Sequence, residues 1–135
     1  MGPRGLASAA RWADGICGMS ITAQAAEAEQ AFNDARQAWA SAGRAEPPKL
    51  NTAFWFALGD DANRQLEIHL TRYFNWLDTG TRDFMVKQGG FRGNASAFKD
   101  RLKAFADTGA DELLLIPTAI DPAEVDRAAE VIASL

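Results

Sequence analysis

An unbroken apolar run near the C-terminus most constrains the fold of this chain. The run comprises Leu113, Leu114, Leu115 and Ile116, within residues 111–118. A half-exposed antiparallel strand alternates apolar and polar residues. An unbroken run therefore predicts a strand that is covered on both faces, as in a parallel sheet flanked by helices. A helix is predicted on each side of this strand, which is the order of elements in βα repeats.

The spacing of apolar residues and of cap residues predicts the other elements. Helices are predicted at residues 3–13, 23–42, 61–77, after the cap Asn94 and from Asp121, with a helical turn near residues 82–87. Strands are predicted at residues 16–19 and 50–58, the second covered on both faces. Gly15 is expected to close the first helix in a left-handed conformation, and Thr22 to cap the second. The chain is therefore predicted to be α/β.

The composition of the chain argues against nucleic acids and membranes as its partners. The 135 residues are 47% hydrophobic and 24% charged, with a formal net charge of −4. This acidic balance, without a cluster of Lys or Arg, predicts that nucleic acid is not a partner. The apolar runs are too short to cross a bilayer, and the first residues lack the apolar segment of a secretory signal. A cytoplasmic protein that does not enter membranes is expected.

Three predicted strands are too few for a closed barrel, which in the (β/α)8 fold needs eight. The order of elements leaves two interpretations open. The chain is either a small three-layer α/β sandwich or the C-terminal part of a larger barrel.

Two stretches carry a resemblance to a known family. They are residues 2–15, GPRGLASAARWADG, and residues 91–118, which Asp121-Pro122 follows; the segment ALGDDA at residues 57–62 also fits. In this order the stretches resemble the C-terminal part of the bacterial luciferase-like monooxygenases, a family of flavin- or F420-dependent oxidoreductases. The resemblance implies a partial TIM (β/α)8 barrel, with residues 1–135 forming the last three or so βα units and their parallel strands.

The resemblance also implies a cofactor and an activity. The cofactor would be FMN or coenzyme F420, bound at the C-terminal ends of the strands and used to oxidise or reduce an unknown small-molecule substrate. Members of the family are more than twice as long as this chain, and their Gly-Thr-Pro helix start is Gly93-Asn94-Ala95 here. The chain is therefore expected to be a C-terminal fragment that is inactive alone.

Four residues are candidates for cofactor binding. Gly2, Arg4 and Gly5 stand at a helix start, where free backbone N–H groups and a positive side chain suit a phosphate. An ordinary helix start explains the same residues. Thr118 follows the C-terminal end of a strand, on the face where such barrels bind their ligands.

The sequence assigns neither a catalytic residue nor a metal ligand. His69, the single histidine, is interpreted as a structural or surface residue of a helix, and Cys17 as a small apolar residue. The large aromatic residues are assigned to the core by default: Trp39, Phe54, Trp55, Phe56, Tyr73, Phe74 and Trp76.

Two non-catalytic alternatives remain open. The chain could be a truncated barrel remnant or an α/β binding module that self-associates as a homodimer. Unpaired edges of a parallel sheet favour such association.

Overall fold

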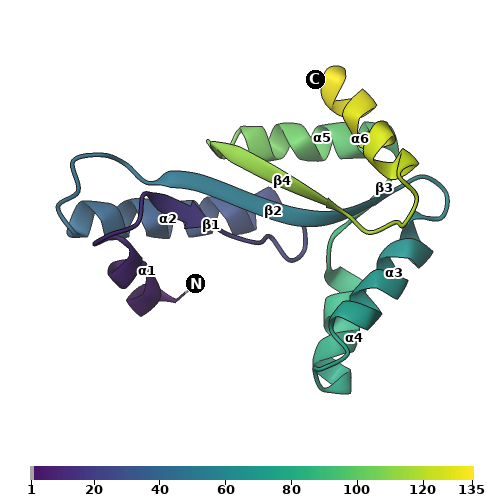
Figure 1. Ribbon diagram of the computed structural model, residues 1–135, viewed down its shortest axis with the longest axis horizontal. Coiled ribbons are helices and arrows are strands. Elements are labelled where there is room, and N and C mark those ends of the chain that lie inside the picture. The colour runs from purple at the N-terminus through teal and green to yellow at the C-terminus, as the bar shows by residue number, and fades with distance from the viewer. Residues whose placement is uncertain (1) are drawn as a thin grey trace.

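The strand β2 (Lys49–Leu58) is the centre of the fold. A computed structural model describes residues 2–135 and shows four parallel strands with helices on both faces of the sheet (Figure 1). The remaining elements are α1 (Pro3–Ala9), β1 (Gly15–Cys17), α2 (Ala25–Ser41), α3 (Ala62–Tyr73), α4 (Thr79–Gln88), β3 (Phe91–Gly93), α5 (Ala95–Ala106), β4 (Glu112–Pro117) and α6 (Ala123–Ala133). No helix within residues 2–135 combines the length and the apolar character that crossing a membrane requires.

Every other strand pairs with β2. Asn51 of β2 lies opposite Cys17 of β1 and also opposite Glu112 of β4, so β1 and β4 take opposite edges. Phe56 of β2 likewise lies opposite both β3 and β4. The strands β1 and β3 therefore share one edge of β2, one at each end, and β4 occupies the other edge.

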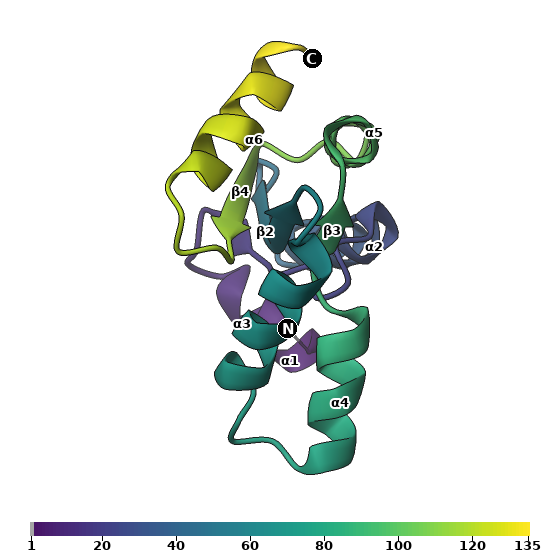
Figure 2. The same ribbon diagram turned by 90° about the vertical axis from the view of Figure 1, so that its right-hand side faces the viewer.

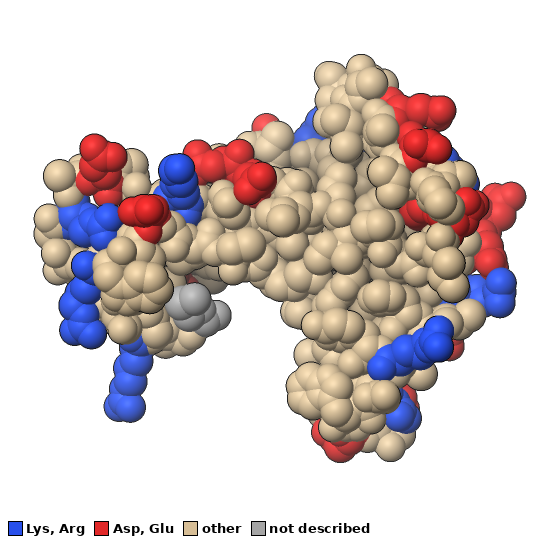
Figure 3. Space-filling view, viewed as in Figure 1, with Lys and Arg blue, Asp and Glu red and all other residues tan. Residues whose placement is uncertain are grey.

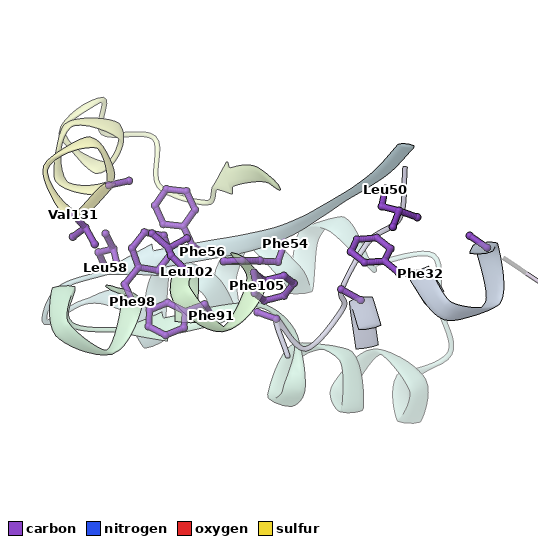
Figure 4. Packing of buried hydrophobic residues seen from close by; sticks show 14 of the residues in the cluster. Phe32, Leu50, Phe54, Phe56, Leu58, Phe91, Phe98, Leu102, Phe105 and Val131 are labelled. Atoms are coloured by element: carbon purple, nitrogen blue, oxygen red, sulfur yellow. The ribbon is translucent and has the colours of Figure 1, made fainter. Parts of the chain in front are cut away.

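One face of the sheet carries the larger core. The even-numbered residues Leu50, Phe54, Phe56 and Leu58 of β2 pack with residues of α2, α5 and α6. Phe98 of α5 stacks on Phe56 with ring centroids 5.1 Å apart, and Figure 4 shows both residues within a cluster of buried aromatic and aliphatic side chains beside β2. Each helix supplies a stripe at helical spacing, such as Phe98, Leu102 and Phe105 in α5.

The opposite face carries a smaller core and is only partly covered. Trp55 and Ala57 of β2 pack against Leu66, Leu70 and Phe74 of the α3 segment. Figure 2 shows α3 and α4 on the side of the sheet away from α5 and α6. We call the face that α3 covers the inner face, and the face that α5 covers the outer face.

The prediction that the Leu113–Ile116 run is covered on both faces is wrong. Leu113 and Leu115 pack on the outer core and Ile116 packs near α3, but Leu114 remains 42% exposed on the inner face. The reason is position: β4 pairs with β2 alone, and α3 covers only part of the inner face. For β2 the same prediction is confirmed, because residues 52–58 are all buried.

Several predicted boundaries also change. Residues 79–88 form a complete helix, α4, in place of a single turn, and β3 was not predicted because three residues carry no periodicity. The side chain of Thr22 does not cap α2; its Oγ1 donates to Glu27 Oε1 at 2.6 Å, and Gln24 takes the N-cap position. The prediction that Gly15 closes α1 is wrong, because α1 ends at Ala9 and Gly15 is the first residue of β1.

Replacing Gly15 with alanine is predicted to destabilise the fold. A Cβ at this position would lie 2.2 Å from the carbonyl oxygen of Lys49, so β1 could not keep its register on β2. We expect the free energy of unfolding, measured by urea denaturation, to fall by about 1–3 kcal/mol. Gly18→Ala is the matched control, because the nearest atom to its Cβ would be Thr52 Oγ1 at 3.9 Å. Equal stability of the two variants would contradict this account of Gly15.

Candidate functional site at the C-terminal end of the sheet

All four strands run in the same direction, so their C-terminal ends point the same way. β2 ends at Leu58, β3 at Gly93 and β4 at Pro117, and these three ends lie on the α3 side of the molecule (Figure 1). In parallel α/β sheets ligands bind beyond the carboxyl ends of the strands. This end is therefore the place to look for a site.

A depression of about 370 Å³ lies at this end, between α3 and the segment that follows β4. Its lining residues are Ile68, His69, Arg72, Tyr73, Thr118 and Ile120. We call it the α3–β4 pocket. Thr118 is held at its edge, because its backbone N–H and its hydroxyl both donate to the Phe56 carbonyl, at 3.1 and 3.0 Å. Thr118 is thus on the face that the sequence predicts, and its hydroxyl is engaged with the backbone.

His69 is a titratable residue of the pocket whose pKa is changed by the fold. Its ring lies 6.1 Å from the ring of Tyr73, with planes 16° apart, and 6.2 Å from the ring of Trp55. Partial burial lowers the pKa of His69 below its ordinary value of 6.5, so the imidazole is neutral at pH 7. Its Nε2 atom is enclosed and has no hydrogen-bond partner among residues 2–135.

The aromatic residues of this region are not all in the core. Tyr73 is 53% exposed and Trp76 is 71% exposed, which corrects their assignment to the core. Trp39, Phe54, Trp55, Phe56 and Phe74 are buried as predicted. The pocket was missed from the sequence because the apolar stripe of Leu66 and Leu70 accounts for the helix. The available signal was the spacing of His69, Arg72 and Tyr73, three and four residues apart on one face of α3.

A buried carboxylate fixes the start of α6 to the same end of the sheet. Glu124 is fully buried, and its Oε1 accepts a hydrogen bond from the Leu58 N–H at 2.6 Å. Its other oxygen pairs with Arg127. Glu124 therefore ties the end of β2 to α6.

The predicted phosphate-binding residues lie elsewhere. Gly2 is the N-cap of α1, and Arg4 and Gly5 are exposed in its first turn. Leu6 anchors α1 to the outer core. The start of α1 and the α3–β4 end lie on different sides of a hollow in the surface, which Figure 3 shows below the sheet. The chain therefore brings Thr118 together with His69, Arg72 and Tyr73, but not with Gly2, Arg4 and Gly5.

The fold is similar to that of known oxidoreductases. No protein-family model matches the sequence, and no curated protein matches it either. Among solved structures, an F420-dependent secondary alcohol dehydrogenase in complex with an F420–acetone adduct matches 99% of the chain, with a TM-score of 0.71 and 15% identity. This dehydrogenase is a luciferase-like enzyme, and the chain shares the fold of part of it. The α/β fold class and the parallel strands predicted from the sequence are thereby confirmed.

Two further structures match over nearly the whole chain. EDTA monooxygenase from Chelativorans sp. BNC1 matches 99% of it, with a TM-score of 0.62 and 13% identity. Coenzyme F420-dependent tetrahydromethanopterin reductase from Methanopyrus kandleri matches 97%, with a TM-score of 0.56 and 16% identity. The chain spans just under half the length of these structures, between 45% and 46%. The chain thus shares the fold of part of these structures.

The lowered pKa of His69 predicts a dependence of stability on pH. Between the ordinary pKa and the lowered folded pKa, the unfolded chain binds more protons than the folded chain. Stability is therefore expected to be greatest above about pH 6.5 and to fall as the pH decreases toward the folded pKa. Thermal melts between about pH 5.5 and about pH 7 measure this, with His69→Leu as the comparison. An unchanged slope in His69→Leu would contradict the assignment.

Proposed function

We propose that this chain forms part of a luciferase-like oxidoreductase that uses FMN or coenzyme F420. The observation that carries the proposal is the match to the F420-dependent secondary alcohol dehydrogenase, which spans 99% of this chain. The match to EDTA monooxygenase supports a second version of this proposal, in which the oxidoreductase is a monooxygenase. The α3–β4 pocket supports it independently, because it lies beyond the carboxyl ends of parallel strands.

Two groups of residues have proposed roles toward the cofactor. Arg4 offers an exposed cation in the first turn of α1, where Gly2 and Gly5 carry no side chain, and these three residues suit a phosphate. Thr118 borders the α3–β4 pocket at the C-terminal end of the strands, where the reactive part of the cofactor would lie. The bound cofactor supplies hydride transfer or reaction with oxygen. The chain's own residues position the ligands.

Catalysis is proposed to need more of the barrel than this chain contains. The chain matches less than half of each enzyme, and its inner face is partly open at Leu114. We also propose that the protein is cytoplasmic and that its substrate is a small molecule.

Removal of one cation is predicted to weaken binding of the cofactor. FMN and coenzyme F420 would each be titrated into the chain, with their fluorescence as the readout. Arg4→Gln is expected to raise the dissociation constant of the bound cofactor about tenfold, because a charge-assisted hydrogen bond to phosphate is lost. Arg11→Gln, a second exposed arginine just beyond α1, is the control. Failure of both cofactors to bind, or equal losses in the two variants, would contradict the proposal.

A non-catalytic association is the second candidate function, and the edge of β4 favours it. Within residues 2–135, β4 has a partner strand on one edge only. Its middle residues, Leu113–Ile116, are all apolar, and the charge and the proline that protect sheet edges stand only at its two ends, at Glu112 and Pro117. A second copy of the chain is the proposed partner, because the apolar middle of this edge on one copy can pair with the same residues on another.

Substitution on β4 is predicted to weaken this association. The wild-type chain is expected to show the mass of a dimer in size-exclusion chromatography with light scattering. Leu114→Lys, which places a charge on the open inner face, is expected to raise the dissociation constant of the dimer at least about tenfold. Val125→Lys is the control, since Val125 is 55% exposed on α6. A monomeric wild-type chain would refute self-association.

A further inference from the structure

We propose that the α3–β4 pocket binds the carboxylate of a small organic monoacid, whose apolar part lies on the exposed isoleucine side chains. The proposal names a substrate class for the oxidoreductase proposed above, and in that respect it rests on the proposed function. Binding of the acid itself depends only on the groups that line the pocket.

The charge of the pocket comes from Arg72. Within residues 2–135, Arg72 forms no ion pair, and its side chain is exposed at the pocket wall. Arg64, two turns earlier on α3, is neutralised by Asp61 at 3.0 Å. Arg72 is thus available to an external anion, and a guanidinium binds a carboxylate through two parallel hydrogen bonds. A single free cation favours a single negative charge.

His69 supplies a neutral polar group beside Arg72. Burial lowers its pKa, and its enclosed Nε2 has no hydrogen-bond partner among the described residues. Such unsatisfied buried atoms are uncommon in folded proteins and call for an explanation. A carboxylate held by Arg72 would lie beside this imidazole, and rotation of the ring out of its enclosed position would let Nε2–H donate to it. A nearby negative charge would also raise the pKa of His69.

The rest of the pocket is apolar or aromatic. Ile120 is 98% exposed, Ile68 is 45% exposed, and Tyr73 presents half of its ring to solvent. These residues suit the hydrocarbon part of a ligand and leave a highly charged molecule without partners. A volume of about 370 Å³ accommodates a small molecule of this kind.

Benzoate and benzamide test the proposal, because the two probes have nearly the same shape and differ in charge. The chain has one histidine, so its imidazole signals in NMR spectra need no assignment. Benzoate is expected to shift these signals and to raise the pKa of His69, whereas benzamide is expected to bind at least about tenfold more weakly. Arg72→Gln should weaken benzoate binding about tenfold and leave benzamide binding unchanged. Arg64→Gln is the control on the same helix.

Three results would overturn the proposal: equal binding of the two probes, unmoved imidazole signals at saturating benzoate, or equal losses in Arg72→Gln and Arg64→Gln. Both arginines are exposed, so neither variant is expected to unfold the chain. If benzoate does not bind while FMN or F420 still binds, only the proposed acid site is refuted. Failure of the cofactors while benzoate binds would instead remove the proposed function and leave the acid site.

Discussion

The pairing of β2 on both of its edges is the constraint on which the rest of the structure depends. β1, β3 and β4 each take their register from β2. Both faces of β2 are also buried: its side chains Phe54 and Phe56 pack in the outer core, and its side chain Trp55 packs in the inner core. One strand of ten residues thus connects the two cores, and a loss of its register would disturb both at once.

The position of the candidate site follows from this arrangement. Because every strand is parallel to β2, the segment after β4 reaches the same end of the sheet at which β2 turns into α3. Thr118 is held there by the Phe56 carbonyl, and α3 returns along the inner face beside it. His69, Arg72 and Tyr73 then face Thr118 without any direct hydrogen bond to β4 among the described residues. Stable pairing of the strands therefore positions the pocket, and the exposed side chain of Arg72 in its lining is accessible to a ligand.

The sequence predicted the elements more reliably than their environments. The run through Phe54, Trp55 and Phe56 correctly predicted a strand covered on both faces. The run from Leu113 to Ile116 predicted the same cover, and that prediction was wrong. Both runs have the composition of a buried parallel strand, and composition does not say how many neighbours a strand has. Gly15 shows the same limit. Its sequence context favours a helix end, but its actual reason is the close approach of the Lys49 carbonyl, a contact between residues far apart in the chain.

The failed prediction for β4 follows from its single paired edge and from the incomplete cover over Leu114. A strand with apolar residues on both faces is suited to a sheet that continues on both edges and is covered on both sides. β4 has one paired edge here, and the chain spans just under half of each matched structure. In a barrel the inner face is packed by layers of side chains from neighbouring strands. Leu114 is thus suited to a barrel interior, which under the proposed function the rest of the barrel would supply and under the alternative a second copy would cover. Both proposals therefore explain the exposure of Leu114. They differ in what covers this side chain: the rest of a barrel or a second copy of the chain.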